Sequence, residues 1–273
     1  MTATPLNRPA ALAWLADVSA LTTRSVIALR RRPEVLAFSV IQPILFVLLF
    51  TQVFAGAIPV QSDDYTNYLM AGIFAQTVVF SSMVCGITIA EDLKKGIIDR
   101  FRSLPMHPSA ILMACTLSNL IVSAFSILVM AVTGLLVGWR FNEGWWNMLA
   151  GLGLLLAFSW AMSWLMVALG VRLGDARSVN TAAMLIVMPL SFLSNAFVPL
   201  ETMTGWVKAV AQWNPVSTLV QACRSLFGNL GSAPTPEGWP LQDAVAATLG
   251  YLVLFVVLFG PLAAWAFRAR TSR

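Results

Sequence analysis

Six long stretches of this chain contain no charged residue, and this pattern limits the folds that the chain can adopt. Each stretch can supply the roughly 20 apolar residues with which an α-helix crosses a bilayer core of about 30 Å. A segment inside lipid must satisfy its own backbone hydrogen bonds, so helices are the expected structure. The pattern predicts an all-α integral membrane protein with six transmembrane helices. The uncharged stretches are residues 35–62, 65–90, 108–139, 144–171, 178–200 and 244–267.

The composition agrees with this class, and the positions of the charges predict an orientation. Hydrophobic residues make up 58% of the chain and charged residues 11%, whereas about a quarter of a soluble domain is charged. With a cytoplasmic N-terminus, all Lys and Arg residues except Arg140, Lys208 and Arg224 fall on the cytoplasmic side. The positive-inside rule therefore predicts a multi-pass protein of the cell inner (plasma) membrane with both termini cytoplasmic. The net charge of +5 is explained by topology, and nucleic acid is not an expected partner.

The chain divides into three parts, which are a cytoplasmic N-terminus (1–33), a six-helix transmembrane domain (34–267) and a cytoplasmic tail (268–273). Within the first part, Asp17, Arg24 and Arg31 recur every seven residues, which predicts an amphipathic helix lying on the membrane surface. Its cationic side chains can meet anionic lipid headgroups. The basic residues assigned to this helix are Arg24, Arg30, Arg31 and Arg32.

The predicted outer surface carries aromatic residues and a region of short apolar runs. Trp139, Trp145 and Trp146 are typical of an aromatic belt at the membrane interface. The region 198–240 contains an apolar run, 209–223, that is too short to cross a bilayer. We therefore expect one or two short re-entrant or interfacial helices before the last span.

Several function classes lack the residues that they need. The six predicted spans carry no charged residue at their cores, which disfavours an ion-coupled transporter, although sodium sites can be built from carbonyls and hydroxyls. A phosphate-binding loop needs a Lys that follows a Gly, and none of Lys94, Lys95 and Lys208 does. With His107 as the one histidine and three dispersed cysteines, neither an active site nor a metal site is indicated.

The polar segment 91–105 is the most informative cytoplasmic part of the sequence. Four apolar residues spaced by four, four and three positions form one face of a short helix that Pro105 ends. Such a helix between two spans suits docking into a groove of a soluble partner, and the alternative is a helix that rests on lipid. The four residues are Leu93, Ile97, Phe101 and Leu104.

Two motifs resemble those of ABC-2 type transporter permeases, especially the daunorubicin-resistance type. The first is E-D-L-K-K-G-I-I-D-R-F-R-S-L-P-M-H-P at 91–108, and the second is F-V-P-L-E at 197–201 followed by W-N-P-V-S at 213–217. The resemblance implies a half-transporter in which two permease subunits, identical or homologous, surround a pathway. Cytoplasmic ABC ATPase subunits would then hold the ATP and Mg, because this chain binds no cofactor itself. Members of the family move drugs, lipids and polysaccharide chains.

The resemblance assigns roles to particular residues. The segment 91–105 would act as a coupling helix seated in the ATPase, beside the N-terminal interfacial helix. The coupling residues would be Glu91, Leu93, Gly96, Ile97, Arg100, Phe101, Arg102, Leu104 and Pro105. The outer re-entrant region would include Pro199, Glu201, Trp213, Asn214, Pro215 and Arg224.

Further expectations concern the ion pairs and the path. We expect Glu91 to accept a backbone amide or to pair with Arg24 or Arg30. We also expect Arg224 to neutralise Glu201. An apolar and aromatic path for an amphiphile is predicted at five residues, whose alternative role is to face lipid or to pack between helices. They are Phe38, Phe46, Phe50, Phe74 and Phe80. The expected function is an ATP-driven exporter of an amphiphilic drug, lipid or glycolipid, with a membrane scaffold that binds a soluble partner as the alternative.

Overall fold

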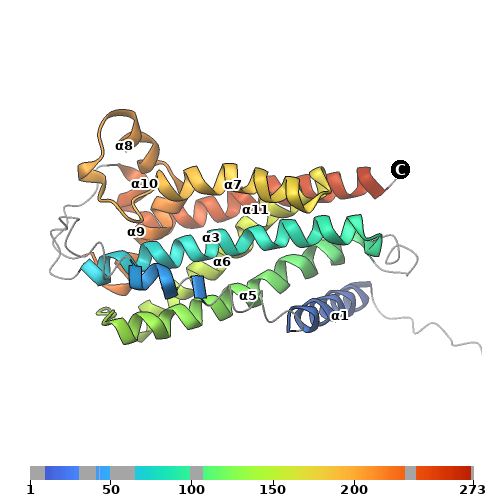
Figure 1. Cartoon of the computed structure of the whole chain (residues 1–273), viewed down its shortest axis with the longest axis horizontal. Coiled ribbons are helices and arrows are strands. Elements are labelled where there is room, and N and C mark those ends of the chain that lie inside the picture. Colours follow the sequence, from blue (N-terminus) through green and yellow to red (C-terminus); the bar gives the residue numbers. More distant parts are fainter. Residues whose placement is uncertain are drawn as a thin grey trace, which may run out of the picture.

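The computed structural model describes residues 10–30, 41–42, 44–49, 65–98, 107–230 and 238–271, and all regular elements in these ranges are helical (Figure 1). Residues 41–42 and 44–49 are also helical. The elements are α1 (Ala10–Arg30), α3 (Tyr65–Lys94), α5 (Pro108–Val137), α6 (Trp145–Leu173), α7 (Ala176–Phe192), the 3₁₀ turn η1 (Leu200–Thr202), α8 (Gly205–Gln212), α9 (Pro215–Phe227), α10 (Trp239–Gln242) and α11 (Ala244–Thr271).

Four of the described helices, α3, α5, α6 and α11, are long and apolar enough to cross a membrane. A helix of 29 residues is about 43 Å long, which covers the bilayer core and part of the headgroup layers. These helices confirm four of the six predicted spans. The span predicted at 178–200 is shorter, because α7 ends at Phe192 and turns follow it. Most of the span predicted within 35–62 lies outside the described residues.

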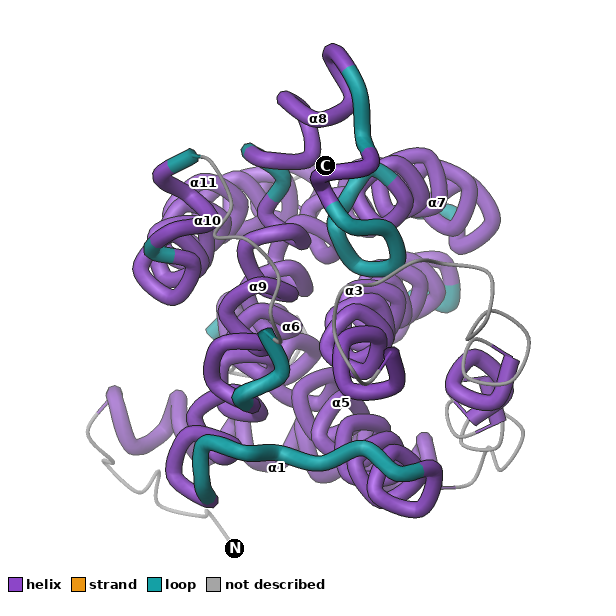
Figure 2. The backbone as a smooth tube through the Cα atoms, turned by 90° about the vertical axis from the view of Figure 1, so that its left-hand side faces the viewer, coloured by secondary structure: helices purple, strands orange, loops and turns teal. Residues whose placement is uncertain are grey.

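The helices α3 and α6 form the centre of the bundle, with α5 on one side and α7 and α11 on the other (Figure 2). Their backbones approach closely at Gly86 of α3 and Gly170 of α6. A Cβ atom built on Gly86 would lie 2.5 Å from the Met166 carbonyl oxygen, and one on Gly170 would lie 2.4 Å from the Gly86 carbonyl oxygen. Small residues permit such contacts between helices in lipid, so larger side chains at either position would separate the two central helices.

A seam of hydroxyl groups joins three helices near the middle of the bundle. The Oγ atoms of Ser81 on α3 and Ser123 on α5 are 2.9 Å apart, and Ser123 Oγ lies 2.7 Å from Ser159 Oγ on α6. Asn119 of α5 also donates to the hydroxyl of Ser163. Hydrogen bonds of this kind hold transmembrane helices together where no water competes. We call these residues the serine seam.

The two ends of the bundle carry different elements (Figure 1). The helix α1 lies across one end, which we call the α1 end, and α11 also finishes there. The short elements η1, α8, α9 and α10 lie at the opposite end, the α8 end. Because α7 finishes and α11 begins at the α8 end, the chain between them enters and leaves on the same side. This arrangement fits the short outer helices that the sequence predicts before the last span.

One aromatic residue has a different place from the one predicted. Trp145 and Trp146 are strongly exposed, as residues of an aromatic belt are, but Trp139 is fully buried. Its indole Nε1 donates to the side-chain oxygen of Asn229 at 2.9 Å, and its ring packs against Phe227. The assignment of Trp139 to the membrane interface is therefore wrong, because the indole finds both its polar and its apolar partners inside the protein.

Candidate functional site

The predicted coupling segment begins as the last turn of α3. Glu91 accepts a hydrogen bond from the Lys95 ammonium at 2.8 Å, and the pair is four residues apart on the helix. Gly96 then adopts a positive φ of 65°, which favours glycine and ends the helix, and Ile97 starts another short helical stretch. The predicted span 65–90 thus continues to Lys94. The rest of the coupling residues, Arg100, Phe101, Arg102, Leu104 and Pro105, lie outside the described residues.

The turn at Gly96 changes which apolar side chains face the protein. Ile98 is almost fully buried among residues of α1, α5 and α6, and Leu93 packs against the same cluster. Ile97, which the spacing of the predicted helix placed beside Leu93, is half-buried. Ile98 was not predicted to be buried, because the spacing of the four apolar residues from Leu93 to Leu104 assumes one uninterrupted helix over 91–105. A glycine between Leu93 and Ile98 was the available signal that the helical phase changes.

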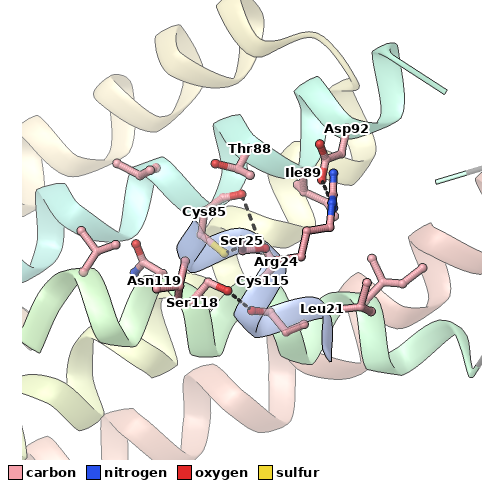
Figure 3. Close-up of a pocket in the computed structure, with 15 residues that line it drawn as sticks. Leu21, Arg24, Ser25, Cys85, Thr88, Ile89, Asp92, Cys115, Ser118 and Asn119 are labelled. Atoms are coloured by element: carbon pink, nitrogen blue, oxygen red, sulfur yellow. Dashed lines mark hydrogen bonds and ion pairs between the residues drawn. The ribbon is translucent and has the colours of Figure 1, made fainter. Parts of the chain in front are cut away.

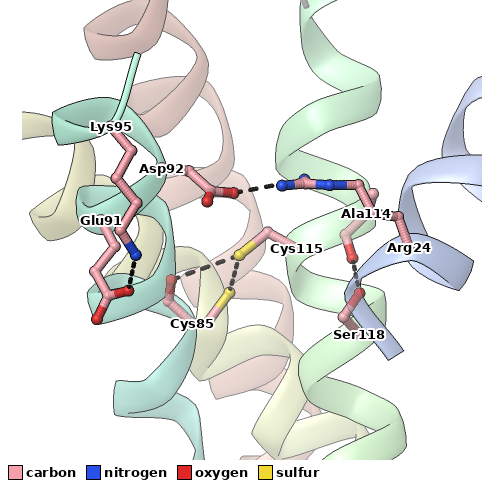
Figure 4. A network of polar contacts seen from close by, with 8 residues as sticks. All are labelled: Arg24, Cys85, Glu91, Asp92, Lys95, Ala114, Cys115 and Ser118. Atoms are coloured by element: carbon pink, nitrogen blue, oxygen red, sulfur yellow. Dashed lines mark hydrogen bonds and ion pairs between the residues drawn. The ribbon is translucent and has the colours of Figure 1, made fainter. Parts of the chain in front are cut away.

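The helix α1 is fixed to the bundle by one apolar stripe and two polar contacts. Val18 and Leu21 are buried against α3 and α5. The indole Nε1 of Trp14 donates to Ser109 Oγ at 3.0 Å. A guanidinium nitrogen of Arg24 lies 3.8 Å from a carboxylate oxygen of Asp92 (Figure 4). The structure thus places Asp92, beside Glu91, opposite Arg24.

The outward surface of α1 is apolar as well. Leu12, Leu15 and Ile27 are about half exposed, on a side of the helix different from that of Val18 and Leu21. A helix with one apolar stripe in the protein and another outside it suits the edge of a bilayer. Of the basic residues assigned to this helix, Arg24 and Arg30 lie on α1, and Arg31 and Arg32 lie outside the described residues.

Charged residues also tie the α1 end of α3 to α7. The Lys94 ammonium donates to Asp175 Oδ1 at 2.8 Å. Asp175 is the N-cap of α7, where its carboxylate accepts the backbone N–H of Ser178. The hydrogen bond from Lys94, and then that from Ser178, lowers the pKa of Asp175 from 3.8 to about 2. The carboxylate is therefore ionised at any physiological pH.

A second tie joins α11 to α6. The guanidinium of Arg270 donates to the carbonyl oxygens of Val171 at 2.6 Å and of Arg172 at 3.3 Å. A cation at the end of a helix also interacts favourably with the helix dipole. These contacts join α6 and α11 to each other at the α1 end.

A groove of about 340 Å³ lies along the middle of α3. It is bounded by the helical segment at 41–49, by α5 and by α7, and Phe46 and Phe80 line it. Polar side chains without charge also face it, among them Gln42, Gln76 and Asn180. The volume is within the range of small-molecule sites.

Gln76 is the most unusual residue of this groove. Its side chain is 5% exposed, and its Oε1 atom has no hydrogen-bond partner among the described residues. A buried amide oxygen without a donor costs free energy, so this position favours a ligand that carries a hydroxyl or N–H group.

Three of the five phenylalanines of the predicted path are among the described residues, and two of these three line the groove. Phe46 and Phe80 line the groove, whereas Phe38 and Phe50 lie outside the described residues. Phe74 is fully buried in the core, where its ring centroid is 5.4 Å from that of Trp139. Phe74 therefore has the alternative role, packing between helices.

The Asn-Pro pair of the outer region joins α7 to α9. Asn214 is the N-cap of α9, and its side-chain oxygen accepts the Val216 N–H at 2.8 Å. Its amide nitrogen donates to the carbonyls of Leu190 and Leu193, both at 2.8 Å. Pro215 occupies the first helical position, where no N–H is needed. One side chain thus caps a helix and holds the end of α7.

Arg224 of α9 joins two further segments at the α8 end, which are α3 and the turn after α7. Its side chain is 2% exposed and lies over the ring of Tyr68, 3.5 Å from the centroid. It donates to the carbonyl of Tyr68 at 3.0 Å and to those of Asn195 and Ala196 at 3.0 and 3.2 Å. Arg224 is therefore buried inside the protein, whereas it was predicted near the outer surface. The pairing with Glu201 stays a prediction.

The other two outer residues mark the boundary of this region. Pro199 precedes η1, and its carbonyl accepts the hydroxyl of Thr202. Trp213 is 63% exposed, and its carbonyl accepts the hydroxyl of Tyr251 on α11 at 2.7 Å. The exposed indole suits a position at the membrane interface.

Comparisons with known proteins agree with this architecture. Residues 16–227 match the model of the family described as ABC-2 type transporter. The chain is 29% identical over 252 residues to the daunorubicin resistance ABC transporter permease protein DrrB1 of Streptomyces coeruleorubidus, covering 92% of this chain and 87% of that protein. It is 25% identical over 256 residues to the probable doxorubicin resistance ABC transporter permease protein DrrC of Mycobacterium tuberculosis, covering 90% and 92%.

A third relative is the putative transport permease YvfS of Bacillus subtilis, which is 26% identical over 232 residues and covers 81% of this chain and 86% of that protein. The family match extends from α1 to the end of α9, and so includes the coupling segment and the groove. In this family the membrane permease and the ATPase are separate subunits. The chain belongs to the ABC-2 type transporter family and is an integral, multi-pass permease subunit.

Proposed function

We propose that this permease exports an amphiphilic drug, lipid or glycolipid, driven by cytoplasmic ABC ATPase subunits that bind ATP and Mg. One observation carries the proposal. The helix α3 continues without a break from the groove at Gln76 and Phe80 to the coupling segment at Lys94. A displacement of its α1 end is therefore transmitted directly to the groove. Relatives named for resistance to daunorubicin and doxorubicin support an amphiphilic substrate.

The proposed topology has six passes, with both termini and the α1 end in the cytoplasm. The described helices α3, α5, α6, α7 and α11 supply five passes. The position of α1 at one end of the bundle and of the start of α3 at the other supports a sixth pass between residues 30 and 65. The domains are then 1–33, 34–267 and 268–273. The basic residues of α1 and of the coupling segment support this orientation.

The coupling mechanism proposed for this subunit is mechanical. Closure of the two ATPase subunits on ATP displaces the segment 91–105. The α1 end of α3 then moves relative to α7, because the ion pair of Lys94 and Asp175 that joins them there is exposed and rearranges easily. The groove between α3 and α7 then changes shape. A second permease subunit, identical or homologous, would complete the pathway on the open side of the groove, and membrane lipid would surround the rest.

The test is reconstitution of the chain with its ATPase in vesicles, with transport of a panel of lipids and drugs as the readout. Gly96→Pro fixes φ near −65° where the structure needs 65°, and Phe101→Asp places a charge on the predicted docking face. We expect both variants to insert normally and to lose transport. Export driven by an ion gradient without ATP would indicate a secondary transporter, and ATPase binding without transport of any amphiphile would indicate a scaffold.

The groove is tested separately with Gln76→Leu, which removes the buried amide and keeps the approximate volume. We expect weaker transport of amphiphiles with a hydroxyl or N–H group, by about fivefold, which corresponds to one hydrogen bond of about 1 kcal/mol. Thr133→Val on α5 is the matched control, because its hydroxyl already donates to the Val129 carbonyl. Equal transport by both variants would exclude Gln76 from the path.

A further inference from the structure

Two thiol groups face each other where α3 and α5 meet near the α1 end. The Sγ atoms of Cys85 and Cys115 are 2.9 Å apart, although the residues are 30 positions apart in the chain (Figure 4). Cys115 Sγ is also 3.5 Å from the Cys85 carbonyl oxygen. The sulfur atoms of a disulfide are about 2.05 Å apart, so these two have about 0.9 Å to travel before they can bond.

The two thiols line a cavity of about 90 Å³ that α1 covers (Figure 3). Leu21 and Arg24 of α1 lie on one side of this cavity, and Asp92 lines it near the end of α3. Cys85 is buried, whereas Cys115 is half-buried and can be reached from the cavity. Cys115 is therefore the thiol that a small oxidant would meet first.

The surroundings favour a disulfide over a bound metal ion. Two thiolates around a monovalent soft ion would leave one negative charge among apolar helices, which is costly in a membrane. A disulfide has no charge. The described residues also contain no group of three or more His, Cys, Asp or Glu side chains that could complete a metal site.

We propose that Cys85 and Cys115 are a redox modification site, oxidised by a hydroperoxide to a disulfide that stops coupling. In the first step the sulfur of Cys115 attacks the peroxide oxygen, which gives a sulfenic acid and releases the alcohol with the thiol proton. In the second step the sulfur of Cys85 attacks this sulfenic sulfur, and water leaves with the second thiol proton. The two thiols lose two electrons in total, and the hydroperoxide gains them. Cysteine pairs that form reversible disulfides in the cytoplasm act as redox sensors.

The effect on transport follows from the position of the pair and depends on the proposed function. The segment 91–105 lies entirely between the two cysteines in the chain. The disulfide would therefore join α3 and α5, the two helices on either side of this segment. The serine seam already joins Ser81 to Ser123 farther along the same two helices. With the disulfide as a second, covalent link, α3 and α5 cannot move past each other near the α1 end, where the coupling segment would contact the ATPase. The side chains there are small, as at Ala114 and Ser118, and allow such movement in the reduced protein.

The experiment uses the full chain with its ATPase in vesicles, treated with cumene hydroperoxide. Trypsin cleavage at Lys95 or Arg100 separates Cys85 from Cys115, so only the disulfide keeps the two fragments together on a non-reducing gel. We expect joined fragments and loss of ATP-driven transport after treatment, with both effects reversed by dithiothreitol. Cys115→Ser should give separate fragments and transport that resists the peroxide.

Cys223→Ser is the matched control, since Cys223 is buried in α9 away from this pair, and it should behave as the wild type does. If Cys115→Ser does not insert, Cys85→Ser serves the same purpose. Fragments that separate in treated wild type would overturn the site, and joined fragments with normal transport would overturn its effect on coupling. Untreated wild type that moves no amphiphile would instead refute the proposed function, while the fragment assay would still report the disulfide.

Discussion

The two ends of this permease are held together by different kinds of interaction. At the α8 end, Arg224, Asn214 and Trp139 are at most 5% exposed, and each bonds to groups from other segments of the chain. At the α1 end, Lys94 and Asp175 form an ion pair in which the side chains are 68% and 40% exposed. Buried hydrogen bonds to fixed carbonyls hold one geometry, whereas exposed ion pairs contribute about 0–1 kcal/mol and rearrange easily.

This difference suits a subunit that is driven from one end. The α1 end also contains the cavity between α1, α3 and α5, so its helices have room to shift. The α8 end has a continuous aromatic cluster in which Phe74, Trp139 and Phe227 contact one another. With a rigid α8 end and an adjustable α1 end, a displacement of the α1 end of α3 would change the angle between α3 and the neighbouring helices. Four substitutions test this comparison.

The largest expected effect is that of Arg224→Met. The variant leaves the carbonyls of Tyr68, Asn195 and Ala196 buried without this donor, and hydrogen bonds to a charged group contribute about 1.5–3 kcal/mol each. We expect a loss of about 3 kcal/mol or more in unfolding free energy, measured by denaturation in detergent. Arg177→Met is the control, because Arg177 is exposed at the start of α7. Equal stability of the two variants would show that the α8 end is not rigid for this reason.

Asn214→Ala should have the next largest effect. It removes an N-cap and two hydrogen bonds to the end of α7, which together correspond to about 2 kcal/mol. Asn147→Ala provides the comparison, since Asn147 donates one exposed hydrogen bond to the Glu143 carbonyl. Thermal unfolding in detergent should separate the two variants clearly. A smaller shift for Asn214→Ala than for Asn147→Ala would contradict the role of Asn214.

Much of the fold could be predicted from the sequence, because an uncharged run in a membrane has few alternatives to a helix. The ends of the runs were less predictable. The run 178–200 continues past Phe192, but the chain leaves the helix there, since Arg224 and Ser217 bond to the backbone of residues 195 and 196. These bonds join positions more than 20 residues apart, and no local pattern reveals them.

The contacts of the site were predictable only in part. An acidic residue opposite Arg24 was expected, but helix packing decides between Glu91 and Asp92, which point in different directions on α3. Arg224 was counted among the outer cations because it lies between the fifth and sixth predicted spans, and its burial depends on carbonyls from two other segments. The close approach at Gly86 and Gly170 likewise needs the relative placement of two helices.

Gly96→Ala tests the adjustable end, where the effect on stability should be smaller than the effect on function. A non-glycine residue in the left-handed conformation costs about 1–2 kcal/mol, and here the cost falls on the last turn of α3. We expect a loss of about 1 kcal/mol in stability together with a marked fall in transport per ATP hydrolysed. Gly153→Ala on α6 has open space around the added methyl group and should be neutral or slightly stabilising. If Gly96→Ala keeps full coupling of transport to ATP hydrolysis, the turn at Gly96 does not transmit the displacement from the ATPase to α3.

The smallest expected effect is the pH dependence that Asp175 contributes. Its pKa is lowered from 3.8 to about 2, chiefly by the hydrogen bond from Lys94, so the folded state binds this proton less readily than the unfolded state. The stabilisation is therefore complete above about pH 4 and is lost as the pH falls through about 2. The unfolding midpoint of the wild type minus that of Asp175→Asn should decrease as the pH is lowered from 5 to 2. Because the pair is exposed, added salt should reduce the difference as well. A difference that depends on neither pH nor salt would mean that Lys94 and Asp175 do not pair in solution. In that case α3 would be joined to α7 at this end by apolar packing alone.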